Sequence, residues 1–184
     1  EVDSALEARS VDISSVSGEI QTEEIKCPGK AVFGSTSGSI RVKTVDAEEN
    51  VNFSSVSGSI RCEELRSGDK VGISSTSGRV DIGDAVCRSF TSNTVSGSIR
   101  ISGLTGQGKL SSTSGELYMN VNELTGDLSL NSVSGSIRCE LPAGADVGVS
   151  MNSLSGSKYS DFGSGGAHSL NASTTSGSIR IVKK

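Results

Sequence analysis

Hydrophobic and polar positions alternate along this chain in a unit that returns about every 20 residues. Each unit contains a Ser-Gly pair, and the second and fourth residues after most of the glycines are apolar, as in Ile60 and Cys62. The residue between them is polar, as in Arg61. This period of two predicts a β-strand with Ile60 facing inward and Arg61 facing outward. The nine glycines are Gly18, Gly38, Gly58, Gly78, Gly97, Gly115, Gly135, Gly156 and Gly177.

A second apolar pattern stands five and seven residues before each glycine, as in Val51 and Phe53. It is out of phase with the strand that follows the glycine, and an odd step between inward positions indicates a corner. Polar stretches between the units are also typical of tight turns. We therefore expect corners at Ser14–Ser15, Ser54–Ser55, 28–30, 48–50 and 67–70.

Equivalent positions of successive units match like with like, which is typical of stacked coils and not of antiparallel hairpins. The pattern predicts an all-β fold: a single-chain, right-handed parallel β-helix (β-solenoid) of about nine coils. At ~4.8 Å per stacked strand the rod would be roughly 40 Å long. We expect one domain over 1–184, with a partial coil continuing from upstream at 1–10, an irregular Gly-rich insertion at 157–170, and the last coil and cap at 171–184.

The invariant glycine has two structural explanations at this stage. It either faces inward where the opposite wall leaves no room for a side chain, or adopts a positive φ at a bend. The residue two before it alternates between valine and threonine, as in Val16 and Thr36. Its parity matches that of the inward isoleucines, so we expect this Val/Thr column to face the core. Lys158 is the one residue that interrupts the isoleucine column.

Composition narrows the function classes. The net charge is −4 with no basic run, and aromatic residues make up 3% of the chain, which argues against a nucleic-acid partner. No apolar run approaches the ~18 residues of a membrane span, and no targeting segment is recognisable. His168 has no fixed partner in the sequence and is expected in a loop. We expect no catalytic residues, no cofactor and no metal.

The four cysteines are expected to be reduced core residues. They are several coils apart in the predicted stack, which exceeds the reach of a disulfide, and their spacing does not match a zinc site. They are Cys27, Cys62, Cys87 and Cys139.

Outward arginines form the candidate recognition strip, because they share one column of the predicted stack beside small serines. Such a strip could hold an anionic polymer through charge-assisted hydrogen bonds. The alternative is a solvated strand face, and Asp81, Glu19 and Glu116 interrupt the positive charge. The strip consists of Arg41, Arg61, Arg100, Arg138 and Arg180.

The repeated "SGSIR" and the segment "CELPAGADVGVSMNSLSGS", residues 139–157, resemble a bacterial family of domains of unknown function that carries an adhesin label. That family is similar to the toastrack-type domains of envelope-stress membrane proteins. The resemblance covers the chain from about residue 10 onward. It implies a β-helix and a place at the bacterial surface or envelope, outside the cytoplasm, and it supplies no catalytic residues.

The leading hypothesis is a non-enzymatic structural or adhesive module with a repetitive Ser/Arg face. Its expected partners are cell-wall or surface polysaccharide, another envelope protein, or further copies joined end to end. One alternative is a carbohydrate-active β-helix enzyme acting on an acidic polysaccharide, which would need convergent carboxylates in a cleft. A weaker alternative is an ice-binding solenoid, which the inward assignment of the Val/Thr column disfavours.

Overall fold

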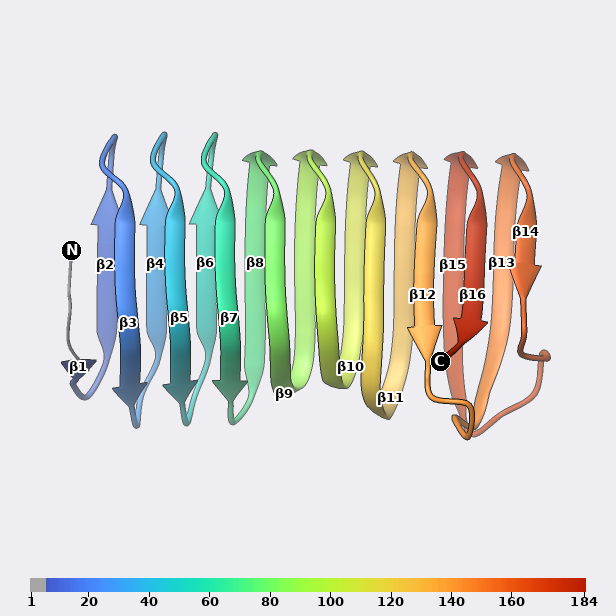
Figure 1. Cartoon of the computed structure of the whole chain (residues 1–184), viewed down its shortest axis with the longest axis horizontal. Helices are drawn as coiled ribbons and strands as arrows, with labels where there is room; N and C mark the ends of the chain where they lie inside the picture. Colours follow the sequence, from blue (N-terminus) through green and yellow to red (C-terminus); the bar gives the residue numbers. More distant parts are fainter. Residues whose placement is uncertain (1–5) are drawn as a thin grey trace.

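The computed structural model describes residues 6–184, and Val2, placed in the upstream partial coil, lies outside them. Sixteen strands and no helix make up the described part, so no helix there could span a membrane. The chain rises along the rear wall of a rod and descends along the front wall while it advances from left to right (Figure 1). This is a right-handed β-solenoid, as the sequence predicts.

Two parallel walls face each other across the core, and the long strands β9 to β11 pass from one wall to the other. The arginine wall contains β1 (Leu6–Glu7), β3 (Ile20–Cys27), β5 (Ile40–Ala47), β7 (Ile60–Ser67), β12 (Ile137–Leu141), β16 (Ile179–Lys183), β14 (Lys158–Ser160) and the first halves of β9 (Val80–Ser96), β10 (Ile99–Ser114) and β11 (Leu117–Ser134). The serine wall contains β2 (Val11–Ser15), β4 (Ala31–Ser35), β6 (Val51–Ser55), β8 (Lys70–Ser77), the second halves of β9 to β11, β15 (His168–Ser176) and β13 (Val147–Ser155).

Register between coils joins identical positions of the repeat. Ile60 pairs with Ile40 on one side and with Val80 on the other, and all three are fully buried. Phe33 and Phe53 stack on neighbouring coils with ring centroids 4.8 Å apart. The inward residues therefore form one continuous apolar core along the rod, whose burial is the main stabilising contribution.

The corner at the glycines differs from the prediction. Ser14–Ser15 and Ser54–Ser55 lie within β2 and β6, and the chain bends at the next four residues, as at 16–19. We call this edge of the rod the glycine corner. The other predicted corners are confirmed, because 28–30 and 48–50 separate successive strands at the opposite edge.

Close approach of neighbouring coils explains the glycine. A Cβ on Gly58 would lie 2.0 Å from the carbonyl oxygen of Gly38, and the same obstruction recurs from Gly38 to Gly177. The opposite wall is therefore not what excludes the side chain, and a positive φ accompanies the bend at only three of these glycines, Gly115, Gly156 and Gly177.

The residue three before each glycine is a serine or a threonine, and in two coils its hydroxyl bonds to the glycine backbone. The buried Ser55 hydroxyl donates to the carbonyl oxygen of Gly58 at 2.8 Å and accepts a hydrogen bond from its N–H at 2.9 Å. Ser15 accepts from the N–H of Gly18 in the same way. These hydroxyls satisfy backbone groups that the bend removes from the strand ladder.

The Val/Thr column does not face the core, contrary to the sequence prediction. Val16 is 75% exposed and Val133 is 52% exposed, because each comes one residue after an inward position of the preceding strand, Ser15 or Ser132, and so faces outward. The column forms a ridge along the glycine corner. The column follows the alternation of the strand before the glycine, and the alternation of the strand after the glycine does not extend back across the corner.

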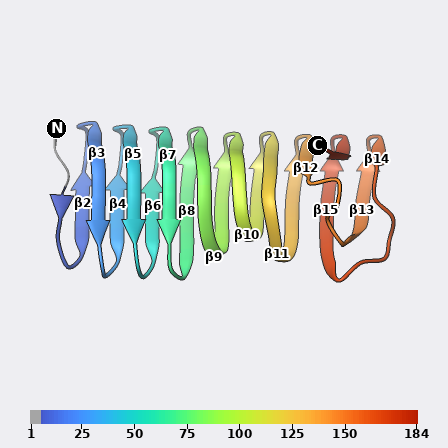
Figure 2. The ribbon, with the colours of Figure 1, turned by 60° about the horizontal axis from the view of Figure 1, so that its bottom comes forward.

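The last coil in the chain is not the last coil in space. β16 pairs with β12, and β15 pairs with β11, so the coil 168–183 lies between β11/β12 and the coil of β13 and β14. The chain leaves β14, passes around the end of the rod and returns to β15 (Figure 2). The expectation that 171–184 caps the rod is therefore wrong, and the end coil is 147–160. His168 is the first residue of β15 and not a loop residue.

Two features protect this end of the rod. Lys158 stands in the register position of Ile179 and is exposed, so a charge occupies the edge strand where an apolar residue would invite another strand. The irregular segment after β14 lies along β13, where the N–H of Val149 donates to the carbonyl oxygen of Gly163 at 2.8 Å, and Phe162 packs against the core. The interruption of the isoleucine column at Lys158 thus marks the end coil.

All four cysteines are free and buried, as predicted. Burial raises the pKa of the Cys62, Cys87 and Cys139 thiols to about 12. These thiols stay protonated at neutral pH and act as small apolar core residues.

Candidate functional site

The predicted arginine strip exists as one column of outward residues on the arginine wall, but its order in space differs from its order in the chain. Each member pairs in register with the next. The column reads Gln21, Arg41, Arg61, Asp81, Arg100, Tyr118, Arg138, Arg180 and Tyr159.

Asp81 divides this column into two groups. Arg41 and Arg61 are adjacent on β5 and β7, and Arg41 forms an ion pair with Glu19 of the preceding coil. A hollow of about 420 Å³ beside them is also lined by Glu23 and Glu63. Carboxylates thus offset the positive charge of this N-terminal group.

The C-terminal group brings together three arginines and both tyrosines of the chain. The guanidinium of Arg100 lies 4.4 Å from the ring centroid of Tyr118, and that of Arg180 lies 5.5 Å from the ring centroid of Tyr159. Arg138 stands between the two pairs. We call these five residues the Arg/Tyr site. It borders a hollow of about 570 Å³ on the arginine wall.

Glu140 fixes the middle of the Arg/Tyr site. Its carboxylate accepts hydrogen bonds from Arg138 Nε at 2.9 Å and from the Tyr118 hydroxyl at 3.1 Å. Burial, and then the bond to Glu140, raise the pKa of Tyr118, so its hydroxyl remains a donor. The carboxylate is therefore held by two partners, while Arg100 and Arg180 form no ion pair within residues 6–184.

Tyr159 is held from the side of the end coil. Its hydroxyl donates to Asp161 at 2.7 Å, and Asp161 also accepts from the backbone N–H of Lys183 at 3.0 Å. These two hydrogen bonds lower the pKa of Asp161, which stays ionised. Tyr159 remains 53% exposed, so its ring is presented to solvent in a fixed position.

Serine hydroxyls lie beside two of the arginines of the Arg/Tyr site. Ser136 and Ser178 line the same hollow as Arg138 and Arg180. Ser157 Oγ lies 3.2 Å from Ser178 Oγ, so hydroxyls of adjacent coils are within hydrogen-bonding distance. This part of the wall offers donors and acceptors beside the positive charge.

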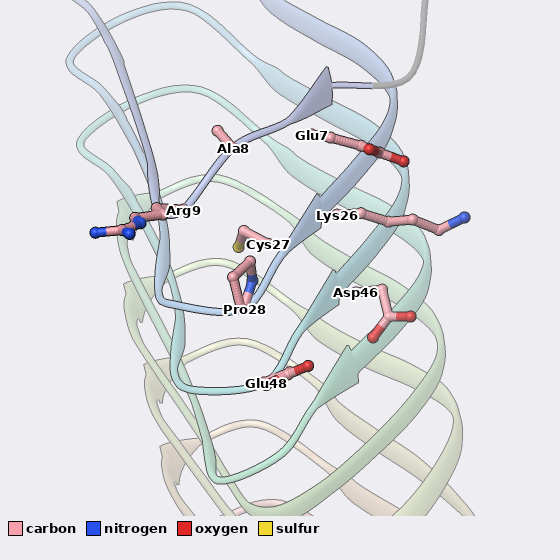
Figure 3. Close-up of a pocket in the computed structure, with 8 residues that line it drawn as sticks. All are labelled: Glu7, Ala8, Arg9, Lys26, Cys27, Pro28, Asp46 and Glu48. Atoms are coloured by element: carbon pink, nitrogen blue, oxygen red, sulfur yellow. The ribbon is translucent and has the colours of Figure 1, made fainter.

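A third hollow, of about 500 Å³, lies near the N-terminal end between β1 and the turn after β3 (Figure 3). Glu7, Lys26 and Asp46 project on its outer side, and Cys27 lies near Pro28 (Figure 3). Burial raises the pKa of the Cys27 thiol, whose Sγ lies 3.4 Å from the carbonyl oxygen of Gly29. This thiol is not activated as a nucleophile. Residues 6–184 contain no group of acidic, histidine or cysteine side chains suited to a metal ion.

Comparison with protein families gives a match over most of the chain. The model described as Toastrack DUF4097 matches residues 4–70 and 49–182. The chain belongs to this family. Toastrack DUF4097 is a family of domains of unknown function, so membership supports the β-solenoid and assigns no activity. No curated protein and no solved structure matches the chain.

The sequence analysis of this toastrack domain did not include the two tyrosines of the Arg/Tyr site among the candidate residues. Tyr118 and Tyr159 occupy the arginine column of the repeat, and that position is visible in the sequence. The direct pairing of Arg138 with Arg180 was not visible, because it depends on the insertion of the last coil between β12 and β14.

Proposed function

We propose that this toastrack domain is a non-enzymatic rod at the bacterial cell surface or envelope, where its arginine wall binds an anionic polysaccharide. The single observation that carries the proposal is the register of Arg138 with Arg180, flanked by tyrosines. Adjacent guanidinium groups bind carboxylate or sulfate groups through charge-assisted hydrogen bonds. A rigid solenoid presents them at a fixed spacing, so little ordering is needed on binding.

Other partners in this proposal meet the rod at its surface or its ends. Another envelope protein could use the same wall. A second copy would associate at the N-terminal end, because Lys158 and the segment after β14 protect the other end.

Binding of the purified domain to isolated cell-wall and acidic polysaccharide fractions tests the proposal. The test variant replaces Arg61, Arg100, Arg138 and Arg180 with glutamine. The control variant removes four exposed charges away from the column, at Lys30, Lys70, Arg88 and Lys109. We expect salt-sensitive binding that the test variant loses and the control keeps. Equal binding by both variants, or none by the wild type at low salt, would refute the proposal.

An enzyme acting on the same polysaccharide is the principal rival. The carboxylate that contacts the Arg/Tyr site, Glu140, is bonded to Arg138 and Tyr118, which leaves it poorly placed as a general acid. Incubation with the bound polysaccharide should therefore release no reducing ends. Release that is lost in Glu140→Gln would replace the proposal with a hydrolase or lyase.

The exposed Val/Thr ridge supports ice binding as a second candidate. Val16, Val56, Val95 and Val133 are all at least 48% exposed and recur along one edge of the rod. The adjoining outward face of the serine wall carries few charged residues, and these are Asp12, Lys70, Lys109 and Asp127. A thermal-hysteresis measurement decides this candidate: ice shaping that Val56→Lys abolishes would favour it, and no hysteresis would remove it.

A further inference from the structure

We infer that the polysaccharide binds at the Arg/Tyr site and not along the whole arginine column, and that its recognised unit is an acidic pyranose, a sugar ring bearing a carboxylate. This inference rests on the proposed function. It selects one half of the column and one chemical class of polyanion.

The balance of charges favours the C-terminal half of the arginine column as the binding site. The N-terminal hollow sets Arg41, Lys43 and Arg61 against Glu23 and Glu63, with Glu19 paired to Arg41. Its positive and negative charges are therefore equal in number. A polyanion would have to displace the ion pair between Arg41 and Glu19 before it could bind this group.

At the Arg/Tyr site, positive side chains outnumber the carboxylates that are free to neutralise them. Arg100, Arg138 and Arg180 line its hollow with two carboxylates, Glu116 and Glu140, and Glu140 is engaged by Arg138 and Tyr118. Asp161, beside Tyr159, has the positive charge of Lys183 near it, so the arginines still outnumber the carboxylates left to them. Arg180 has no carboxylate partner in the described chain and is exposed on the strand face. Its guanidinium is therefore the group most available to a ligand carboxylate.

Tyrosine distinguishes an acidic sugar from other polyanions. The half-exposed ring of Tyr159 lies beside Arg180 and is anchored through Asp161, so its orientation is set before binding. An aromatic ring gains from contact with the C–H face of a pyranose, whereas a polyphosphate chain offers no such face. Ser178 and Ser157, on the same two coils, supply hydroxyls for the sugar hydroxyls.

Three polymers separate these contributions: polygalacturonate carries rings and carboxylates, polyphosphate carries charge alone, and dextran carries rings alone. Binding is measured for the wild type, Arg180→Gln, Tyr159→Ala and the matched control Arg61→Gln, after urea unfolding has shown that each variant is folded. We expect the wild type to prefer polygalacturonate. Arg180→Gln should weaken its binding about tenfold, the loss of one charge-assisted contact, and Arg61→Gln should leave it within about twofold. Tyr159→Ala should weaken binding of polygalacturonate and leave polyphosphate unchanged.

The outcomes distinguish this inference from the proposal beneath it. Equal binding of polygalacturonate and polyphosphate, equal losses in Arg61→Gln and Arg180→Gln, or no effect of Tyr159→Ala would overturn the inference while the polyanion-binding function stands. Absence of wild-type binding to both charged polymers at low salt would overturn both.

Discussion

Arg138 and Arg180 are register partners on β12 and β16, although the whole of the coil 147–160 and the segment after it separate them in the chain. The insertion of the last coil creates this pair. Stacking in chain order would instead set Tyr159 beside Arg138, with Arg180 beyond it. The candidate binding site is thus a product of topology as much as of the repeat.

The glycine positions at the glycine corner should not tolerate a side chain. We expect Gly58→Ala to lower the free energy of unfolding by about 1–3 kcal/mol, because its Cβ would overlap the carbonyl oxygen of Gly38. Gly144→Ala is the matched control, since nothing lies within 4 Å of a Cβ there. Urea unfolding measures both, and equal stability of the two variants would contradict the close-stacking explanation.

Inward and outward positions of one strand should respond in opposite ways. Ile60→Asp should unfold the rod, because it places an unpaired charge in the stacked core. Arg61→Ala should change the free energy of unfolding by no more than about 0.5 kcal/mol, as is usual for a solvated position. Circular dichroism and urea titration give both values. A large loss in Arg61→Ala would show that the guanidinium has a structural role.

The charge on the end coil should keep rods apart. Lys158→Ile restores the apolar column at the exposed edge of β14, so we expect concentration-dependent association in sedimentation velocity. Lys158→Gln serves as the control for loss of charge without gain of an apolar edge. If Lys158→Ile sediments as the wild type does, the segment around Phe162 protects this end without help from the lysine.

Alkaline pH should destabilise the fold through its buried thiols. The pKa of Cys62 and Cys139 is about 12 in the folded chain, against an ordinary value of 9.0, so the unfolded state loses protons first. The stability contributed by these thiols is complete below pH 9.0 and falls as the pH rises toward about 12. Urea midpoints at about pH 8 and about pH 10.5 should differ more for the wild type than for Cys62→Ala/Cys139→Ala. An equal fall in both would assign the effect to the remaining titratable groups, among them Cys87, the lysines and the tyrosines.

The repeat predicted the fold because each coil contacts only the coils next to it, so the same inward and outward positions recur in every repeat. The spacing of the glycines and the alternation around Ile60 and Arg61 are enough to indicate strands, their facing sides and their like-on-like register. The same like-on-like register places Arg41 beside Arg61 and Arg138 beside Arg180. Period-two reasoning failed where the chain bends, so the corner was placed too early and Val16 was assigned to the core.

The order of the coils could not be predicted from the repeat, because every coil of a solenoid offers the same register to its neighbours. Lys158 is the residue in the sequence that indicates which coil lies at the end of the rod. A lysine in the isoleucine column fits only a coil with one open side, and its neighbour Ile179 fits an interior coil. Together these residues favour the order that the structure shows over the order of the chain.

Cysteine cross-linking tests most directly whether the inserted coil assembles the Arg/Tyr site. Register partners on adjacent strands lie about 4.8 Å apart, within the range that a disulfide spans, and positions two coils apart lie well outside it. We predict that mild oxidation links the variant Arg138→Cys/Arg180→Cys and leaves Arg138→Cys/Tyr159→Cys unlinked, while the native thiols stay protected by burial. A disulfide in the second variant and none in the first would show that the coils stack in chain order, and the Arg/Tyr site as described would not exist.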